Sequence, residues 1–322
     1  MTSHLLNVLI IGAGNIGALF GAPNDTNVLS HAHAFSRSKH YNLLGFVDSI
    51  YAKALNAAKI WDCAAYISIF DAFAKNNIDV VIVASPDETH YELLRQLAKF
   101  KISIVIAEKP LTCSVVDSEE IELLYKKSDI PIVVNYTRRF VPEFTKIKDK
   151  IASGVFGTYL SGTGYYGKGL AHNGTHMIDT VQYLLSNILS TTAYSSINDY
   201  TESDKSWTVR LELDDGTHFY MNAIDSRCYT IFEIDLFFQF NRIKILNSGL
   251  NIEIYTSKPS DIYTGYYGLE LSEVIQTSLY NSLEHLADNV YMHLKFNESL
   301  ASTERNAILA QRIISKTSDL GL

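Results

Sequence analysis

Three short motifs in this sequence combine glycines, an amine, imidazoles and carboxylates at spacings that support chemistry. The first follows the apolar run Asn7–Ile11 and reads Gly12-Ala13-Gly14-Asn15-Ile16-Gly17. Glycines at this spacing permit a tight turn and a close backbone approach to a pyrophosphate, and the N–H groups of a following helix attract phosphates. We therefore predict a dinucleotide site here, with a purely structural glycine turn as the alternative.

The second motif is Glu108-Lys109-Pro110, which comes directly after the apolar run Ile102–Ile106. A proline restricts the backbone of this turn, so that the lysine ammonium is held just beyond the end of a buried strand. This placement indicates a functional amine. The alternative is a surface turn in which Glu108 forms a salt bridge with Lys109 or another neighbour.

The third motif contains His172, Gly174, His176 and Asp179 at the start of a stripe of apolar residues with helical spacing. A histidine at this point can act as an acid or a base near neutral pH. His172 and His176 are four positions apart and so resemble a metal pair. However, Gly174 interrupts a helix between them and no third ligand follows at a suitable spacing, so we expect no metal site.

Asp48 ends the strand-like run Tyr41–Val47, where a carboxylate can accept hydrogen bonds from the ribose hydroxyls and so favours NAD over NADP. It lies 31 positions after Gly17, where roughly 20 is usual, because turn-forming residues 21–27 break the first helix. Two alternatives stay open. Ser49 could face the 2′-phosphate of NADP, and Asp48 could only cap the next helix.

Two histidines before Asp48 have a different expected role. His31 and His33 lie two apart on a predicted helical segment and therefore point in different directions. We expect each of them to serve in packing or capping.

Strand-like and helix-like runs alternate through the first 136 residues. The strands are predicted at Asn7–Ile11, Tyr41–Val47, Val80–Ala84, Ile102–Ile106 and Ile132–Val134, and helices at Ser49–Lys59, Ser68–Asn76, Glu88–Phe100 and Asp117–Lys127. This alternation predicts a Rossmann-like, doubly wound parallel sheet of the α/β class. Ligands of such a sheet bind beyond the carboxyl ends of its strands, where the glycine motif, Asp48 and Lys109 are all expected to lie.

The pattern changes after Pro142. A helix is predicted at Glu143–Ala152, a hairpin at Leu211–Thr217, further strands at Phe232–Phe238, Ile243–Leu246 and Asn251–Tyr255, and helices at Leu283–Leu294 and Glu304–Lys316. These runs predict a mostly antiparallel sheet with helices on one face. We place a dinucleotide-binding domain at residues 1–128 and a second α/β domain, for substrate binding and oligomerisation, at residues 129–322.

Composition excludes several classes of protein. The 322 residues are 47 % hydrophobic and 19 % charged, as in ordinary globular proteins, and a net charge of −8 argues against nucleic acid as the main partner. The three cysteines, Cys63, Cys113 and Cys228, share no CxxC spacing and are expected to be reduced thiols. No apolar run reaches ~18 residues and residues 1–4 lack Lys and Arg, so we expect no membrane span, no signal peptide and a cytoplasmic protein.

Taken together, the motifs resemble the Gfo/Idh/MocA family of NAD(P)-dependent oxidoreductases over nearly the whole chain. The matching residues are Gly12–Gly17, Asp48, Ser85-Pro86, Thr89-His90, Glu108-Lys109-Pro110, Asn135, Arg138-Arg139-Phe140, Pro142, Gly174-Thr175-His176 and Asp179. The resemblance implies a Rossmann domain joined to an α/β domain with an open sheet, which shapes the sugar pocket and often forms the oligomer interface. It also implies hydride transfer between nicotinamide and a secondary alcohol of a sugar, cyclitol or nucleotide sugar.

The same resemblance implies roles for single residues. Lys109 and His176 would be catalytic, with Lys109 beside the nicotinamide ribose and the reacting hydroxyl, and the Lys109–Pro110 bond would be cis. The cofactor, NAD with NADP as the alternative, would be bound by Gly12, Gly14, Asn15, Ile16, Gly17, Asp48, Ser49, Ser85, Pro86, His90, Glu108 and Lys109. The substrate would contact Lys109, Asn135, Arg138, Tyr166, His172, His176 and Asp179.

One position departs from the family pattern. His172 stands where members acting on polyols usually carry Asp, sometimes Asn, so a carboxylate that would orient a proton is absent. We expect a nucleotide-activated or acidic sugar as substrate and a homodimer or homotetramer formed through the C-terminal sheet. A non-catalytic sensor of dinucleotide or sugar is the main alternative, and a metal-dependent lyase using His172 and His176 is a third.

Overall fold

The computed structural model describes residues 5–319, so the expectation about residues 1–4 lies outside the described residues. The chain forms two compact units: unit 1 comprises Met1–Phe140 and Tyr280–Leu309, and unit 2 comprises Val141–Leu279 and Ala310–Leu322. These units differ from the domains drawn at residue 128, because the strand that follows it and a segment near the C-terminus join unit 1. No helix within residues 5–319 combines the length and apolarity needed to cross a membrane.

Unit 1 is built on a six-stranded parallel sheet. Its strands are β1 (Leu6–Ile11), β2 (Tyr41–Val47), β3 (Ala64–Tyr66), β4 (Val80–Val83), β5 (Ile104–Ala107) and β6 (Ile132–Val134). Their order is β3-β2-β1-β4-β5-β6, so the direction of winding reverses between β1 and β4. This is the predicted doubly wound sheet, and its switch point lies where the glycine motif leaves β1.

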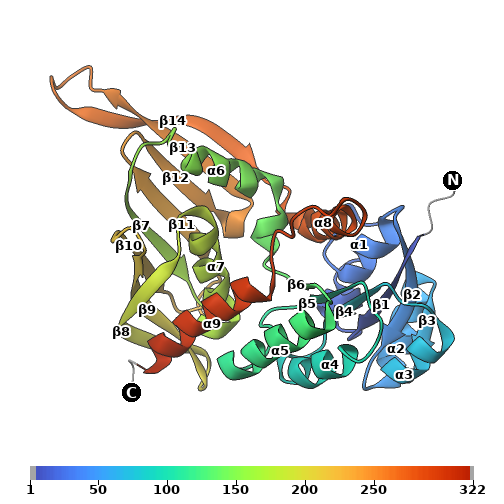
Figure 1. Cartoon of the computed structure of the whole chain (residues 1–322). Coiled ribbons are helices and arrows are strands. Elements are labelled where there is room, and N and C mark those ends of the chain that lie inside the picture. The colour runs from blue at the N-terminus through green and yellow to red at the C-terminus, as the bar shows by residue number, and fades with distance from the viewer. Residues whose placement is uncertain (1–4, 320–322) are drawn as a thin grey trace. The chain divides into compact units, whose positions relative to one another are not determined.

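Helices cover both faces of this sheet (Figure 1). They are α1 (His31–Arg37), α2 (Tyr51–Trp61), α3 (Ile69–Lys75), α4 (His90–Leu97), α5 (Val115–Ser128) and α8 (Ser282–Phe296). Three of them begin at serines whose hydroxyl oxygens accept a backbone N–H in the first turn, namely Ser30, Ser68 and Ser114. Such caps satisfy N–H groups that have no partner inside the helix, and they set where each helix starts.

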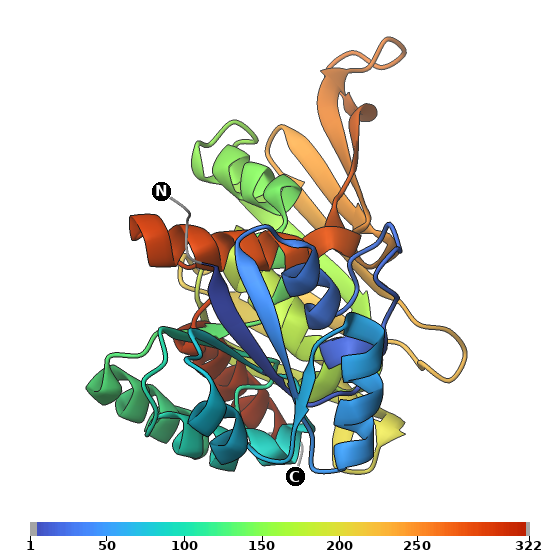
Figure 2. The same ribbon diagram turned by 90° about the vertical axis from the view of Figure 1, so that its right-hand side faces the viewer.

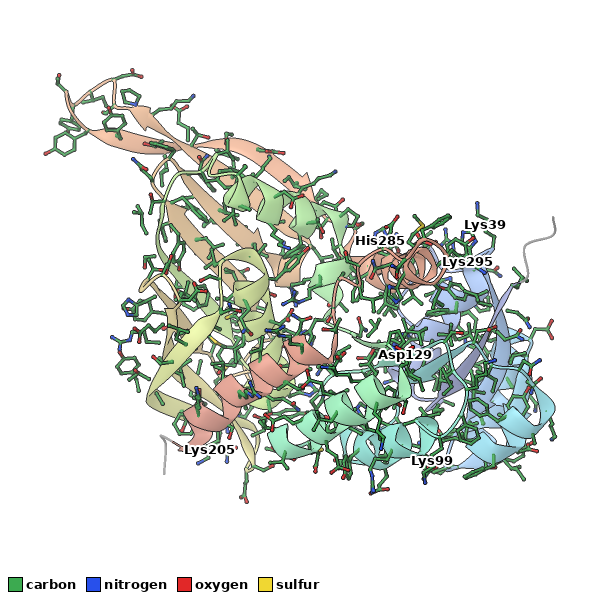
Figure 3. All side chains as sticks on the ribbon, in the orientation of Figure 1. Lys39, Lys99, Asp129, Lys205, His285 and Lys295 are labelled. Atoms are coloured by element: carbon green, nitrogen blue, oxygen red, sulfur yellow. The ribbon has the colours of Figure 1, made fainter. Side chains whose placement is uncertain are left out.

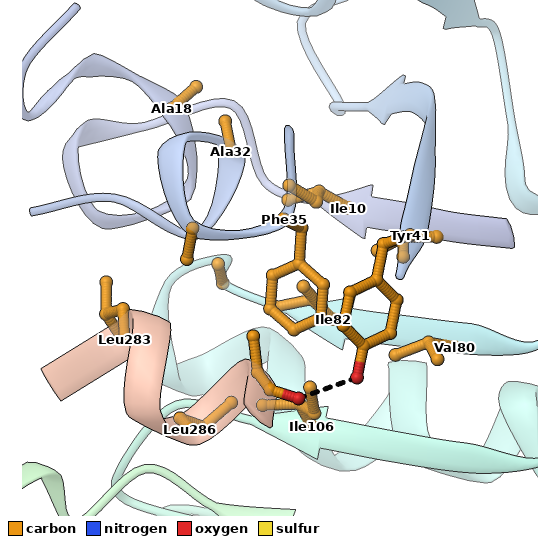
Figure 4. Close-up of a cluster of buried hydrophobic side chains, with 14 of the residues drawn as sticks. Ile10, Ala18, Ala32, Phe35, Tyr41, Val80, Ile82, Ile106, Leu283 and Leu286 are labelled. Carbon is orange, nitrogen blue, oxygen red and sulfur yellow. Dashed lines mark hydrogen bonds between the residues drawn. The ribbon is translucent and has the colours of Figure 1, made fainter. Parts of the chain in front are cut away.

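The core of unit 1 includes a helix that is distant in sequence. In Figures 1 and 2, α8 lies beside α1, and Leu283 and Leu286 of α8 join the same buried cluster as Phe35. The hydroxyl of Tyr41 donates a hydrogen bond of 2.7 Å to the backbone oxygen of Ala287 (Figure 4). The segment after residue 280 therefore completes the apolar layer on one face of the parallel sheet.

Unit 2 is built on an eight-stranded sheet. Its strands are β7 (Tyr159–Tyr166), β8 (Ile188–Thr201), β9 (Asp204–Leu213), β10 (His218–Ala223), β11 (Phe232–Phe238), β12 (Asn241–Leu246), β13 (Asn251–Pro259) and β14 (Tyr267–Gln276). They follow the order β14-β13-β12-β11-β7-β10-β9-β8, and β7 and β10 run parallel while the other neighbours are antiparallel. The predicted open, mostly antiparallel sheet is thus confirmed.

Helices α6 (Pro142–Ala152) and α7 (Thr175–Leu184) belong to unit 2, and α9 (Glu304–Asp319) contributes residues to both units. Gly164 of β7 lets α7 approach the sheet, because a Cβ there would come within 2.3 Å of the Met177 sulfur. The charged side chains of Lys39, Lys99 and Lys295 in unit 1 and Lys205 in unit 2 are exposed (Figure 3), as expected for a globular chain.

Candidate active site

The glycine loop at the end of β1 has one position that faces open space. Gly12 adopts a φ of +103°, and a Cβ on it would lie 2.4 Å from the backbone oxygen of Ala84; a Cβ on Gly17 would lie 2.1 Å from the oxygen of Gly12. A Cβ on Gly14 would have no neighbour within 4 Å. Gly12 and Gly17 are therefore needed for the fold, whereas Gly14 leaves a cradle that fits the close approach of a pyrophosphate.

The helix that follows this loop is shorter and wider than expected. Residues Asn15–Leu19 form a single stretch of π-helix, η1, whose first turn presents N–H groups after Gly14. The chain then continues through the turn-forming residues 21–27 to α1. The predicted break in the first helix is thus confirmed, and it explains the long spacing between Gly17 and Asp48.

Asp48 joins the glycine loop to the turn before α2. Its Oδ2 accepts a hydrogen bond from the N–H of Ala13 and its Oδ1 accepts one from Ile50, each at 2.9 Å. The N-cap residue of α2 is Ile50, and Asp48 also binds the glycine loop through Ala13. Asp48 is therefore not only a helix cap. Asp48 also lines a cavity of about 480 Å³, together with Gly12, Gly14, Ser49, Ser85 and Pro86. Six of the residues predicted to bind the cofactor, from the loops after β1, β2 and β4, thus share one cavity within unit 1, whereas Asn15, Ile16 and Gly17 do not line it.

The loop after β4 is held by hydrogen bonds among its own residues. The hydroxyls of Ser85 and Thr89 lie 2.6 Å apart, and Thr89 donates to the backbone oxygen of Pro86 at 2.7 Å. His90, which was predicted to contact the cofactor, is fully buried and does not line this cavity. Its Nε2 lies 3.0 Å from the backbone oxygen of Ser85. The structure therefore places His90 behind the loop, as a support for it.

Glu108 follows β5 and has two partners for one carboxylate oxygen. Oε1 accepts hydrogen bonds from Asn135 Nδ2 at 2.7 Å and pairs with His31 Nε2 at 2.8 Å. Burial acts to raise the pKa of Glu108, but the hydrogen bonds and charges around it, first of all those of His31, outweigh burial and hold the pKa below its usual value. The expected packing or capping role for His31 left out this bond, because no local pattern links positions 77 residues apart.

Lys109 lies immediately after this anchored glutamate, and the Lys109–Pro110 peptide bond is cis, as predicted. The backbone oxygen of Pro110 lies 2.8 Å from Nδ1 of His90. The neighbouring residue Asn135, together with Arg138, is buried in unit 1 at 2 % and 8 % exposure. The predicted amine is therefore set in a firmly held turn at the carboxyl edge of the parallel sheet.

The histidines of the third motif belong to unit 2. Residues Gly169–Gly174 form a short π-helix, η4, and α7 begins at Thr175. Asp204 accepts hydrogen bonds at 2.9 Å from the N–H groups of Ala171 and His172, so it caps the start of η4, and burial raises the pKa of this carboxyl. The ring of His172 stacks on Tyr200 with 4.6 Å between the ring centroids. His172 and His176 are half-buried, whereas Asp179 is buried.

Tyr166, a predicted substrate contact, has a different place. It is fully buried, and its hydroxyl donates to the backbone oxygen of Trp207 at 2.7 Å and accepts from the Trp207 N–H at 2.9 Å. Burial also raises the pKa of this hydroxyl. The structure thus gives Tyr166 a role in joining β7 to β9. Among the described residues, no group of three or more His, Cys, Asp or Glu side chains is placed to hold a metal ion.

Comparison with known families identifies the first unit. Residues 6–136 match the model of GFO_IDH_MocA, described as an oxidoreductase family with an NAD-binding Rossmann fold. This part of the chain belongs to the Gfo/Idh/MocA family. The predicted cofactor, NAD, is the one that this family description names, and the cradle at Gly14 and the carboxylate of Asp48 suit it.

Sequence relatives cover part of the chain. The rhizopine catabolism protein MocA of Rhizobium meliloti is 25 % identical over 148 residues, which are 46 % of this chain and 43 % of MocA. The inositol 2-dehydrogenase of Corynebacterium glutamicum (strain R) is 30 % identical over 161 residues, 49 % of this chain and 44 % of that protein. The chain thus spans less than half the length of these two curated relatives.

The whole fold has counterparts among solved structures. The WlbA dehydrogenase from Bordetella pertussis, solved in complex with NADH and UDP-GlcNAcA, has a TM-score of 0.80 and 16 % identity, over 100 % of this chain and 98 % of that chain. At this identity the match shows the fold alone. The two sheets of this chain therefore have counterparts in the fold of that protein.

Proposed function

We propose that this chain is an NAD-dependent oxidoreductase that interconverts a secondary alcohol and a ketone of a sugar, with a nucleotide-activated or acidic sugar as the preferred substrate. The observation that carries the proposal is the position of Lys109. It follows β5 at the carboxyl edge of the same sheet whose β1, β2 and β4 loops form the dinucleotide cavity. An amine at this edge lies where ligands of doubly wound sheets bind and react.

In the proposed reaction, bound NAD would accept the hydride that leaves the carbon of the CH–OH group, and in the reverse direction NADH would supply a hydride to the ketone carbon. His176 removes the proton of the substrate hydroxyl, and Lys109 donates a hydrogen bond to the same oxygen while negative charge grows on it. In the reverse direction, His176 returns a proton to the oxygen of the ketone.

A stacked pair of rings in unit 2 supports a sugar with a planar group. The stacked rings of His172 and Tyr200 offer a flat surface, and the backbone of His172 is fixed by Asp204. One compared protein, a dehydrogenase crystallised with a UDP-linked sugar, supports this substrate class, whereas an inositol 2-dehydrogenase supports only the broader class of polyols.

The oligomer belongs to the proposal as well. Nearly every side chain of the edge strand β14 is exposed, including Tyr267, Leu269 and Leu271, and such apolar exposure on a sheet is typical of an interface. We propose a homodimer or homotetramer formed through the sheet of unit 2. Light scattering of the purified protein tests this, and a monomer at micromolar concentration would contradict it.

The proposed activity is tested by following NADH absorbance with a panel of sugars, cyclitols, sugar acids and nucleotide sugars in both directions. Substrate-dependent turnover with NAD supports the enzyme. NAD and sugar binding without any turnover would instead support the non-catalytic sensor, and stoichiometric metal found by elemental analysis of the purified protein would support a lyase.

A further inference from the structure

A buried histidine far from the lysine motif in sequence holds the residue next to Lys109. His31 is the first residue of α1 and has no exposed surface, and its Nε2 lies 2.8 Å from Oε1 of Glu108. Glu108 precedes Lys109 directly, so holding the Glu108 side chain in place also restrains the backbone that leads into the lysine. His31 therefore contacts the residue that directly precedes the proposed catalytic lysine.

His31 is itself rigidly placed. The hydroxyl of Ser30 caps α1 by accepting the N–H of His33 at 3.3 Å. One turn further along the helix, Phe35 packs edge-on against Tyr41 with 4.7 Å between ring centroids, within the same core that holds α8 (Figure 4). The imidazole thus projects from a helix that is fixed at its start and along its buried face.

The carboxylate of Glu108 needs both of its donors. Asn135 and His31 approach the same oxygen, and the charge of Lys109 also acts on this carboxylate. A buried carboxylate that loses a donor seeks another one, because an unsatisfied buried charge is costly. The nearest cation along the chain is the ammonium of Lys109, so the loss of His31 would draw the lysine toward Glu108.

The other side of Lys109 is anchored in the same manner. His90, also without exposed surface, places Nδ1 2.8 Å from the backbone oxygen of Pro110 and Nε2 3.0 Å from that of Ser85. Lys109 therefore lies between two residues that are each held by a buried histidine.

We propose that His31 is a positioning residue for the reaction: through its bond to Glu108 it keeps Lys109 at the place where the lysine meets the substrate oxygen. This inference rests on the proposed function for its kinetic test, and on the geometry of the Glu108 carboxylate for a test without turnover.

The experiment compares His31→Leu, which removes the donor, with His31→Gln, whose amide nitrogen reaches about as far as Nε2. His33→Leu is the matched control, because His33 lies on the same helix with the same burial and packs its ring on Trp61. For each variant we would measure kcat and KM, NAD affinity by calorimetry and the melting temperature. If His31→Leu fails to fold, His31→Asn replaces it, because the asparagine side chain is one bond too short for its amide to reach Glu108.

We expect His31→Leu to lower kcat roughly tenfold or more, because a displacement of a catalytic group by 1 Å can cost about 10²-fold. NAD affinity and KM should stay near the wild-type values, His31→Gln should restore most of kcat, and His33→Leu should change stability alone. An unchanged kcat in His31→Leu, or an equal loss in the leucine, glutamine and His33 variants, would overturn the proposal.

A failure of the proposed function gives a different result, namely no turnover by the wild-type protein with any substrate. Crystal structures of His31→Leu and His31→Gln then decide the question. A Lys109 side chain and backbone displaced in the first and restored in the second supports the positioning role, and an identical Lys109 in both refutes it.

Discussion

The carboxylate of Asp48 accepts a hydrogen bond from the backbone N–H of Ala13 at 2.9 Å, and so ties the end of β2 to the glycine loop after β1. Its other oxygen accepts the N–H of Ile50 at the same distance. One side chain thus shapes the loop that would cradle the pyrophosphate, while its charge lies where the adenine ribose of NAD is expected.

Asp48→Ala should weaken NAD binding roughly tenfold or more, because hydrogen bonds to charged groups are worth about 1.5–3 kcal/mol. Binding of NADP should weaken less, since the substitution also removes a negative charge that repels the 2′-phosphate. Calorimetric titration with both dinucleotides measures the two affinities. Glu92→Ala, which removes an exposed carboxylate from α4, serves as the control, and a parallel loss for both cofactors would argue against the ribose contact.

Gly12 and Gly14 should respond differently to the same substitution. Gly12→Ala should destabilise the fold by about 1–3 kcal/mol or more, because its φ of +103° and the oxygen of Ala84 leave no room for a Cβ. Gly14→Ala should leave the melting temperature nearly unchanged and abolish most NAD affinity, because the methyl group fills the cradle alone. Thermal unfolding and NAD titration of both variants test this. A stable Gly14→Ala protein with full NAD affinity would place the pyrophosphate elsewhere.

Substitutions of Lys109 and His176 should lower the rate of the reaction without weakening cofactor binding. Lys109→Ala and His176→Ala should each lower kcat by roughly 10²–10⁴-fold, the usual worth of acid–base assistance, with NAD affinity retained. Lys101→Ala is the control for lysine, because this exposed residue lies before β5 at its opposite end. Full activity in both site variants would show that the two residues do not act on the substrate.

Glu108 should make stability depend on acidity. Its folded pKa lies below the ordinary value of 4.5, so the unfolded chain binds the proton more readily, and the stabilisation is present above pH 4.5 and lost as the pH falls through the folded pKa. The difference in free energy of unfolding between wild type and Glu108→Gln should therefore shrink as the pH is lowered below 4.5. Urea unfolding at several pH values measures this difference. A difference that grows on acidification would mean that the surroundings of Glu108, including His31 and Asn135, raise its pKa instead of lowering it.

Local patterns were sufficient for most of the secondary structure. The strands Tyr41–Val47 and Ile132–Val134 were predicted to the residue, since both are apolar runs bounded by turn formers. Helix ends agree less closely: α5 begins at Val115, two residues before the prediction, because the hydroxyl of Ser114 caps it. The strands β8 and β14 were not predicted. β8 consists mostly of polar residues without apolar alternation, and in β14 the alternation is short, limited to Tyr267, Leu269 and Leu271.

By itself, the sequence determined that a glycine loop, Asp48 and Lys109 lie at the carboxyl edge of a parallel sheet, because strand periodicity and motif spacing are local properties of the chain. Only the tertiary structure decided that His31 reaches Glu108, that the hydroxyl of Tyr166 is hydrogen-bonded to the backbone of Trp207, and that α8 packs into the core of unit 1. Each of these contacts joins residues distant in sequence. They form because buried donors, acceptors and apolar faces must find partners in the folded chain, wherever in the sequence those partners lie.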